Sequence, residues 1–448
     1  MKPIRQLLLV AAMVPAAIAQ LPSGAALRLT HAPAGATVRI SLSDPENHSY
    51  LIESSPDLVK WSDVGTWKIH NGSFNRNLPL QAGGGLFYRA SYDPTVVVTG
   101  GDVAQALLLP APRANYAAPT LPGRFLVQPI VGQDNTPADN GVTDTGATLG
   151  RVLFYDKRLS LNRTISCASC HQQTHGFSDP ARFSTGFNGG HTDRNSMGLA
   201  NSRWYERRAF FWDERSATLE IQVLEPIQNP VEMGMTLPAL VTRLSAEPFY
   251  ATLFNETFGS PEVTSARISR ALAQFVRSII STRTKFDAGA ATGFTNFTTQ
   301  ENLGRQIFNG AGNCNSCHGS DNFVPGPSIN NNGLENPYTD KGVGALTGRP
   351  QDEGLFKVGS LRNIALTAPY MHDGRFATLE EVVEFYNSGV VAHPNLSPPL
   401  RTGGPNGPPR RLNLTVNEKA ALVAFLNTLT DTALSTDTRF SDPFNYGD

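Results

Sequence analysis

Cysteine and histidine are scarce in this chain of 448 residues, which contains four cysteines and nine histidines. The formal net charge is only −1, so the chain lacks both the basic field of a nucleic-acid-binding protein and a strongly acidic character. It also lacks a run of about 20 apolar residues, the length that a membrane-spanning helix needs. These absences exclude nucleic-acid-binding and membrane-spanning proteins and direct attention to the few reactive side chains.

All four cysteines lie in two copies of one pentapeptide, C-x-x-C-H. The copies are Cys167-Ala168-Ser169-Cys170-His171 and Cys314-Asn315-Ser316-Cys317-His318. In this motif the two thiols become thioethers to a haem, and the histidine binds the iron. The sequence therefore predicts two covalently bound haem c groups and redox chemistry.

A zinc site and disulfide bonds are the alternatives for these cysteines. The first cysteines of the two motifs are 147 residues apart, whereas the pairs of a four-cysteine zinc site usually lie within about 15–20 residues of each other. The histidine after each pair has no role in an all-cysteine zinc site. Both points favour haem.

The first 19 residues have the pattern of a signal peptide. Lys2 and Arg5 precede a short apolar run at 7–14, and Ala17-Ile18-Ala19 fits the cleavage rule. Covalent haem is attached outside the cytoplasm, so export agrees with the haem motifs. We expect cleavage near Ala19 and a soluble protein that is periplasmic, or otherwise extracellular.

Residues 20–95 differ in pattern from the rest of the chain. Alternating or β-branched runs separated by turn residues predict a small antiparallel β module, with strands near 26–30, 36–42, 49–54 and 86–92. The module contains no cysteine, so a spacer or adhesion role without chemistry is expected. Residues 96–123 are rich in Ala, Pro and Leu and are interpreted as a linker.

From about residue 124 the pattern is helical. Residues 262–281 place apolar side chains on one helix face, and Thr298, Thr378 and Thr415 each begin a capping box ahead of an apolar run. We therefore expect a mainly α fold with two cytochrome c-like haem lobes, 124–290 and 291–435, preceded by the β module and followed by a tail at 436–448.

The segment from about 124 to 430 resembles the bacterial di-haem cytochrome c peroxidase family, which includes the MauG-type enzymes. The resemblance rests on an ordered series of blocks and covers about two-thirds of the chain, without the β module. The blocks are 167–171 with 175–179, 194–195, 211–213, 226–234, 314–318, 361–363, 368–374 and 378–381.

The resemblance implies that the N-terminal haem, with His171 as proximal ligand, reacts with peroxide. Glu232 matches the distal glutamate, Gln222 a polar neighbour and Pro226 a pocket-wall residue. Peroxide must lose a proton to bind and regain it as the O–O bond breaks, which is the work of a carboxyl group such as Glu232. From the residues alone, Glu232 is equally a solvated carboxylate at a helix start.

Family members that need reductive activation have a histidine upstream of the Arg-Asn pair, and this chain has Phe187 in that place. Phenylalanine cannot bind iron, so we expect a five-coordinate resting site, as in the MauG-type branch. His191 lies nearby but out of register and is expected to be a surface-loop residue. His175 is expected to be a hydrogen-bonding loop residue beside the haem motif.

For the second haem, the resemblance implies His318 as proximal ligand and Tyr386 on the far side, where other members have methionine. No methionine occurs in 372–448. A phenolate favours ferric iron, so this haem should have a lower potential than a methionine-ligated one. The alternative is a buried aromatic residue on a helix.

The resemblance also places Trp212 between the haems as an electron relay, with core packing as the alternative. Asn195, Thr367 and Pro369 match a calcium site between the lobes, and oxygen ligands of this kind suit that ion. His372 is expected at the same interface as a hydrogen-bond partner of a haem propionate or of the other lobe.

The function implied is reduction of hydrogen peroxide to water. The electrons would come from a small redox protein, a cytochrome c or a cupredoxin. The alternatives are MauG-type oxidation of a protein or organic substrate, a passive di-haem electron-transfer cytochrome, and a surface-attached or sensing protein. The donor and the oligomeric state, including a homodimer, stay open.

Overall fold

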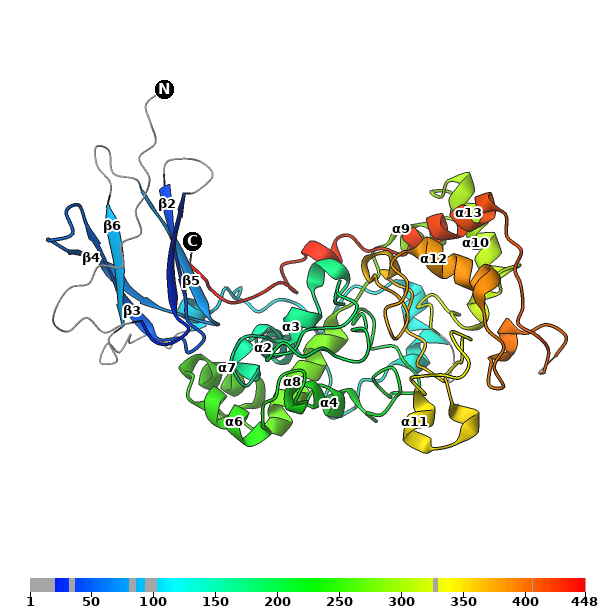
Figure 1. The fold of residues 1–448 in the computed structure, drawn as a ribbon, viewed down its shortest axis with the longest axis horizontal. Helices are drawn as coiled ribbons and strands as arrows, with labels where there is room; N and C mark the ends of the chain where they lie inside the picture. The colour runs from blue at the N-terminus through cyan, green and yellow to red at the C-terminus, as the bar shows by residue number, and fades with distance from the viewer. Residues whose placement is uncertain are drawn as a thin grey trace, which may run out of the picture.

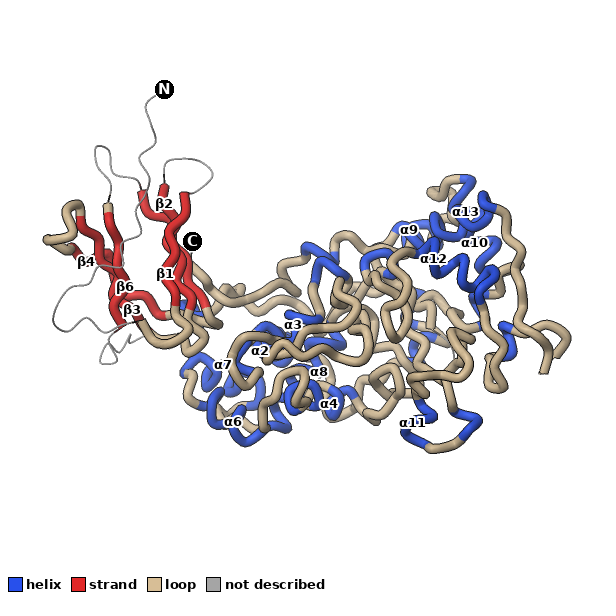
Figure 2. Tube along the Cα trace, in the orientation of Figure 1, coloured by secondary structure: helices blue, strands red, loops and turns tan. Residues whose placement is uncertain are grey.

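A computed structural model describes residues 21–31, 37–79, 86–92, 103–324, 329–404 and 406–447. The expected signal peptide therefore lies outside the described residues. The molecule is elongated, with the β module at one end and the helical region beyond it (Figure 1). Much of the helical region is loop, with short helices set into it (Figure 2). A small antiparallel β module followed by a helical region is what the sequence predicts.

The β module consists of two three-stranded antiparallel sheets, with strand orders β1-β2-β5 and β4-β3-β6. The strands are β1 (Ala26–His31), β2 (Thr37–Ser43), β3 (Ser49–Ser55), β4 (Ser62–Lys68), β5 (Ser73–Pro79) and β6 (Phe87–Tyr92). Ile40, Tyr50, Ile52 and Trp67 form the core of the module. The sequence pattern missed β4 and β5, because Gly65 interrupts the first and polar residues dominate the second.

The helical region contains short helices joined by long ordered loops. The helices are α1 (Val103–Ala106), α2 (Asp144–Tyr155), α3 (Cys167–Cys170), α4 (Leu219–Gln222), α5 (Glu225–Gln228), α6 (Leu237–Ser245), α7 (Pro248–Phe258), α8 (Ser265–Ser278), α9 (Lys285–Ala290), α10 (Thr299–Asn309), α11 (Val343–Thr347), α12 (Leu379–Glu384) and α13 (Val416–Asn427). No helix among the described residues is long and apolar enough to cross a bilayer.

Two helix pairs, α2 with α8 and α10 with α13, are built in the same way. A Cβ on Gly150 would lie 2.0 Å from the carbonyl oxygen of Ala271 in α8. A Cβ on Gly304 would lie 1.9 Å from the carbonyl oxygen of Ala421 in α13. Only glycine allows such close backbone contact. Each pair encloses one C-x-x-C-H motif in the chain, so the helical region contains two similar units, which we call the first helical unit (α2 to α8) and the second helical unit (α10 to α13).

The capping boxes predicted at Thr298, Thr378 and Thr415 are present, and each threonine side chain accepts from the backbone N–H three residues later. The helix expected at 262–281 is α8, which is shorter. Thr264 caps it by accepting from the backbone N–H of Arg267, so the helix begins at Ser265.

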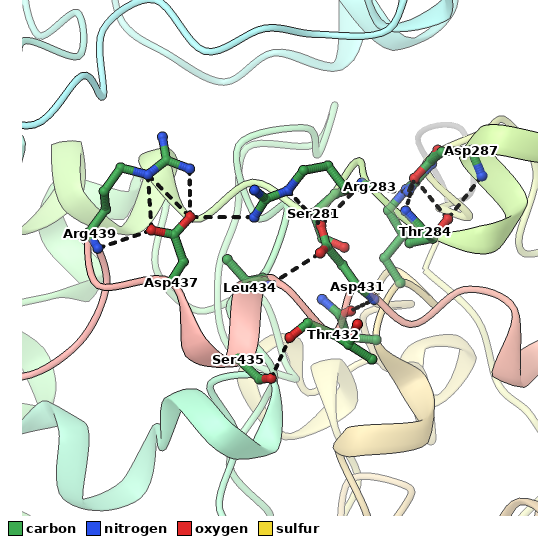
Figure 3. Close-up of polar contacts among 12 residues, drawn as sticks. Ser281, Arg283, Thr284, Asp287, Asp431, Thr432, Leu434, Ser435, Asp437 and Arg439 are labelled. Atoms are coloured by element: carbon green, nitrogen blue, oxygen red, sulfur yellow. Dashed lines mark hydrogen bonds and ion pairs between the residues drawn. The ribbon is translucent and has the colours of Figure 1, made fainter.

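The segment 434–447, which we call the C-terminal strap, runs back along the first helical unit to the β module (Figure 1). Phe440 and Phe444 are buried in the core of that unit. Asp431 and Asp437 tie the start of the strap to Arg283, as Figure 3 shows. The predicted tail is thus packed against the rest of the chain.

Asn71 connects the β module to both the strap and the helical region. Its side-chain amide donates to the carbonyl oxygen of Tyr155 and to the hydroxyl of Tyr446, each at 2.9 Å. Its side-chain oxygen accepts from the backbone N–H of Lys157 at 2.6 Å. These three bonds join segments that are far apart in the sequence.

Candidate functional site

The first C-x-x-C-H motif opens into a cavity of about 850 Å³. Cys167 and Cys170 lie on α3, and His171 follows directly. The His171 Nδ1 lies 2.9 Å from the carbonyl oxygen of Phe177 and 3.1 Å from Ser196 Oγ. A carbonyl oxygen only accepts, so Nδ1 carries the proton and Nε2 keeps its lone pair for a metal. Burial lowers the pKa of His171, which keeps the ring neutral.

Gln222, Pro226 and Glu232 line the same cavity as His171. Gln222 ends α4 and Pro226 lies in α5, so two short helices and the loop after them form this wall. Asn229 donates from its side-chain amide to Glu232 Oε1 at 3.0 Å. Burial raises the pKa of Glu232, partly offset by the charge of Arg215. A carboxyl group with a raised pKa can both take up and release a proton near neutral pH.

The second motif lines a separate cavity of about 300 Å³. Cys314 is the first residue of a 3₁₀ turn, η5 (Cys314–Ser316), and Cys317 follows that turn. The Nδ1 of His318 lies 3.2 Å from the carbonyl oxygen of Phe323. This arrangement repeats that of His171 with Phe177. Burial lowers the pKa of His318 to about 4, so its Nε2 is also an available ligand.

Tyr386 lines the second cavity and lies on a π-helical turn, η8 (Phe385–Gly389). Such turns are rare and frequently occur at functional sites. Burial raises the pKa of Tyr386, while a side-chain hydrogen bond from Asn332 opposes this effect. The phenol therefore stays protonated unless a metal ion binds its oxygen.

Trp212 lines both cavities, and so does Asn195. The indole Nε1 donates to the backbone carbonyl oxygen of Asn195 at 2.8 Å. The backbone N–H of Lys357 donates to the carbonyl oxygen of Trp212, also at 2.8 Å. Trp212 is therefore held by segments of both helical units.

A network of charges lies beside Trp212. Arg194 forms ion pairs with Asp213 at 2.6 Å and with Asp340 at 2.6 Å. His372 is buried, stacks on Phe356 with ring centroids 4.0 Å apart, and accepts the backbone N–H of Asn195 on its carbonyl oxygen at 2.7 Å. These contacts join the two units around the tryptophan.

Comparisons with known proteins identify the relatives of this chain. The family model described as di-haem cytochrome c peroxidase matches residues 144–293. The chain is 35% identical over 297 residues to the methylamine utilization protein MauG of Methylorubrum extorquens, covering 65% of this chain and 80% of that protein. It is 40% identical over 243 residues to the cytochrome c551 peroxidase of Nitrosomonas europaea, covering 53% and 71% of the two chains.

The chain belongs to the di-haem cytochrome c peroxidase and MauG family. The fold also matches the crystal structure of a MauG-like protein associated with microbial copper homeostasis, with a TM-score of 0.61 and 36% identity, over 71% of this chain and 98% of that one. The protein is therefore an enzyme, a di-haem oxidoreductase, and membership implies two haem c groups. The two C-x-x-C-H motifs and their cavities fit those groups.

One thiol of each motif, Cys167 in the first and Cys314 in the second, lies in surroundings that disfavour the thiolate form. Burial raises the pKa of Cys167 to about 12 and that of Cys314 to about 12, so neither thiol is a ready thiolate. The described residues form no disulfide, and they contain no group of three or more Cys, His, Asp or Glu side chains placed to hold a metal ion. The zinc and disulfide alternatives find no support there.

The remaining predicted residues lie around the same two cavities. The expected calcium ligands Asn195, Thr367 and Pro369 all line the second cavity. His191 is exposed and lines the first cavity. Phe187 packs its ring against Gly234, where a Cβ would lie 2.4 Å from it, and its backbone N–H donates to the carbonyl oxygen of Glu232 at 2.9 Å. His175 is half-buried beside the motif.

Three residues at these cavities escaped the sequence analysis. Met371 lines the second cavity and accepts from the side-chain amide of Asn332 on its sulfur at 3.5 Å. It lies inside the block 368–374, so the block itself was the available signal. Tyr205 lines the first cavity and Lys357 lines both. Neither stands in a pattern that predicts a site.

Proposed function

We propose that the protein is a di-haem c-type peroxidase that reduces hydrogen peroxide to water. Peroxide reacts in the cavity of His171 and Glu232, and electrons from an external donor pass through the haem of His318. The observation that carries this proposal is the asymmetry of the cavities. One contains a carboxyl group with a raised pKa, the other a tyrosine, and Trp212 lines both.

In this proposal each haem is joined through thioethers to one cysteine pair, Cys167 with Cys170 and Cys314 with Cys317. His171 and His318 are the proximal ligands, since the hydrogen bond at each Nδ1 leaves Nε2 free. The haems supply the redox chemistry when bound. Phe187 offers no ligand atom, which leaves the position beside Glu232 open to peroxide.

The protein's own contribution to the reaction is proton transfer. Glu232 accepts a proton as peroxide binds and returns it to the departing oxygen. Asn229 holds the carboxyl group through Oε1, and Gln222 adds a polar side chain to the same wall. A carboxyl group with an ordinary pKa would be a poorer acid near neutral pH, so burial suits Glu232 to both steps.

Tyr386 is the proposed second ligand of the His318 haem. Its place in the cavity and on a π-helical turn supports this role. Metal binding would remove the phenol proton despite the raised pKa, and the anionic oxygen would then lower the haem potential. Asn195, Thr367 and Pro369 are the proposed ligands of a calcium ion between the units.

A second candidate is MauG-type oxidation of a protein or organic substrate. Tyr386 and Phe187 favour it, and MauG proteins are among the relatives in the comparisons. A passive electron-transfer cytochrome is less well supported, because such a protein has no use for a carboxyl group beside an open iron position.

The proposed setting is the periplasm, after removal of residues 1–19. The donor would be a cytochrome c or a cupredoxin. The β module contains no cysteine, and its described residues contain no group of three or more Cys, His, Asp or Glu side chains placed to hold a metal ion. A spacer role therefore stays the proposal for it, and cell fractionation with and without residues 20–95 tests a role in attachment.

The deciding experiment combines optical and electron paramagnetic resonance spectra of the ferric protein with one equivalent of peroxide. We expect one high-spin and one low-spin haem, converted without prior reduction to a state oxidised by two equivalents. Two low-spin haems that do not react with peroxide would reject the proposal in favour of the passive cytochrome.

A further inference from the structure

The cavity of His171 has a buried tyrosine that the proposed reaction has not used. Tyr205 is only 3% exposed and lines that cavity. Its hydroxyl donates a hydrogen bond to Glu214 Oε1. Glu214 is in turn held by Arg207, whose Nη2 lies 2.6 Å from Oε2. The phenol thus has a carboxylate in place to receive its proton.

Lys357 lies against the face of this tyrosine. Its Nζ is 3.7 Å from the ring centroid of Tyr205 and 4.5 Å from that of Phe210, and it donates to the carbonyl oxygen of Ala209 at 2.9 Å. The backbone N–H of the same lysine donates to Trp212. One residue therefore contacts both Tyr205 and the tryptophan that lines the two cavities.

Tyr205 is also next to the surface. The three residues that follow it, Glu206, Arg207 and Arg208, are exposed. A protein donor that is too large to enter the cavity can contact this segment. The buried ring of Tyr205 therefore lines the cavity where peroxide would react, and the segment directly after it is exposed.

We propose that Tyr205 is an electron relay between a protein donor at residues 206–208 and the His171 cavity, with Glu214 as the acceptor of its phenolic proton. The relay rests on the proposed peroxidase function and deepens it by naming a second place where the donor's electrons enter, besides the route through the His318 haem. Electrons on this second route reach the His171 cavity without passing through Trp212.

Tyr205 gives one electron to the oxidised site and its proton to Glu214, leaving a neutral phenoxyl radical. The donor then returns one electron to the ring while Glu214 returns the proton. Two such cycles supply two electrons, which with two protons from solvent convert one hydrogen peroxide into two waters.

The surroundings of the ring require proton and electron to leave together. Where Lys357 is protonated, its charge over the ring face makes a positively charged ring costly, and burial lowers the pKa of Lys357 to about 7. Burial and the neighbouring Glu214 carboxylate raise the pKa of Tyr205, so the proton does not leave before the electron. The hydrogen bond to Glu214 gives the proton a destination within the protein.

The test compares Tyr205→Phe and Glu214→Gln with a matched control, Tyr250→Phe. Tyr250 is also fully buried and donates to a carboxylate, Asp156 Oδ2, at 2.6 Å, but it lines neither cavity. The protein with both haems is produced in cells grown on ordinary or on ring-deuterated tyrosine. It is then mixed with one equivalent of peroxide and frozen for electron paramagnetic resonance. Turnover is measured with reduced cytochrome c and with ascorbate.

We expect a radical signal in the wild type that ring deuteration narrows, and its loss in Tyr205→Phe. Turnover with cytochrome c should fall about tenfold in that variant. The first reaction with peroxide should stay unchanged, because it does not need a donor. Turnover with ascorbate should also stay unchanged, because this small donor can reach the cavity directly. Tyr250→Phe should match the wild type in every measurement.

The outcomes separate the relay from the peroxidase itself. A wild type that does not react with peroxide overturns both. A normal peroxide reaction with the same radical in Tyr205→Phe overturns the relay alone, as does an equal loss in Tyr250→Phe. If Tyr205→Phe does not fold, Glu214→Gln decides, since it keeps the packing and removes the proton acceptor. Unchanged radical formation in that variant also overturns the relay.

Discussion

The indole Nε1 of Trp212 donates to the backbone carbonyl oxygen of Asn195 at 2.8 Å, and both residues line both cavities. This bond fixes the direction of the indole N–H. A tryptophan held between two cofactors can shorten the distance for electron transfer, and a packing role would leave the transfer rate unchanged when the indole is replaced.

Replacing Trp212 with Phe should therefore slow electron exchange between the haems while leaving both attached. Rapid-mixing spectroscopy after peroxide addition measures this, with an expected slowing of about tenfold or more. Trp204→Phe is the matched control, because Trp204 lines the first cavity but not the second. Equal rates in Trp212→Phe and Trp204→Phe would leave Trp212 as a packing residue.

Glu232→Gln should slow the reaction with peroxide by about 10²- to 10⁴-fold, the usual contribution of a general acid–base group. The amide keeps the shape of the side chain, so the resting spectra should not change. Glu256→Gln is the control, since Glu256 pairs with Arg113 at 2.9 Å and neither residue lines the cavity. Stopped-flow absorbance measures both, and unaltered kinetics would remove Glu232 from the mechanism.

The pH dependence of the same reaction follows from the raised pKa of Glu232. The carboxylate is the form that accepts a proton from peroxide, so the rate should rise with pH through this pKa and fall below it. Because burial raises the pKa, the rise should occur above the range of an ordinary glutamate. In Glu232→Gln this rise of the rate with pH should disappear. If the rise remains in that variant, it belongs to the titration of another group.

The sequence predicted those parts of the fold and site that have a local signal. The capping boxes at Thr298, Thr378 and Thr415 give helix starts to the residue, because one threonine and one glutamate satisfy the first N–H groups by themselves. The C-x-x-C-H motifs predict the cofactor in the same local way, because five consecutive residues contain both attachment thiols and the iron ligand. Strand β5 has no such signal, since its place depends on pairing with β2.

Residues brought together over long distances in the sequence could not be predicted. Lys357 contacts Tyr205, which lies 152 residues earlier in the sequence, and no pattern near either residue predicts the contact. Asn71 joins Tyr155 and Tyr446 through a single amide. Tertiary structure decides such contacts. Tyr386 was predicted as a ligand only because the family has a ligand at a fixed distance after the residue that matches His372.

Tyr386→Phe should change the spectrum of the second haem and raise its reduction potential, because an anionic oxygen ligand is lost. Electron paramagnetic resonance and a redox titration measure the two effects. Tyr338→Phe is the control, since Tyr338 is buried in the same hydrophobic cluster and hydrogen-bonds to Asn331 but does not line the cavity. Spectra that match the wild type would show that Tyr386 does not bind the iron.

The C-terminal strap should stabilise the first helical unit through Phe440. This side chain is 3% exposed and packs edge-on against Phe177, whose carbonyl oxygen holds His171. Phe440→Ala leaves a cavity and should lower the free energy of unfolding by about 3–5 kcal/mol. Chemical denaturation followed at the haem absorbance measures the loss.

The exposed neighbour Thr438 gives the control for this prediction, because Thr438→Ala should change stability by less than about 0.5 kcal/mol. Since the strap also binds the β module through Tyr446 and Asn71, its loosening by Phe440→Ala should speed proteolytic cleavage between the module and the helical region. Equal stability and cleavage in the two variants would mean that the strap lies on the unit without holding it.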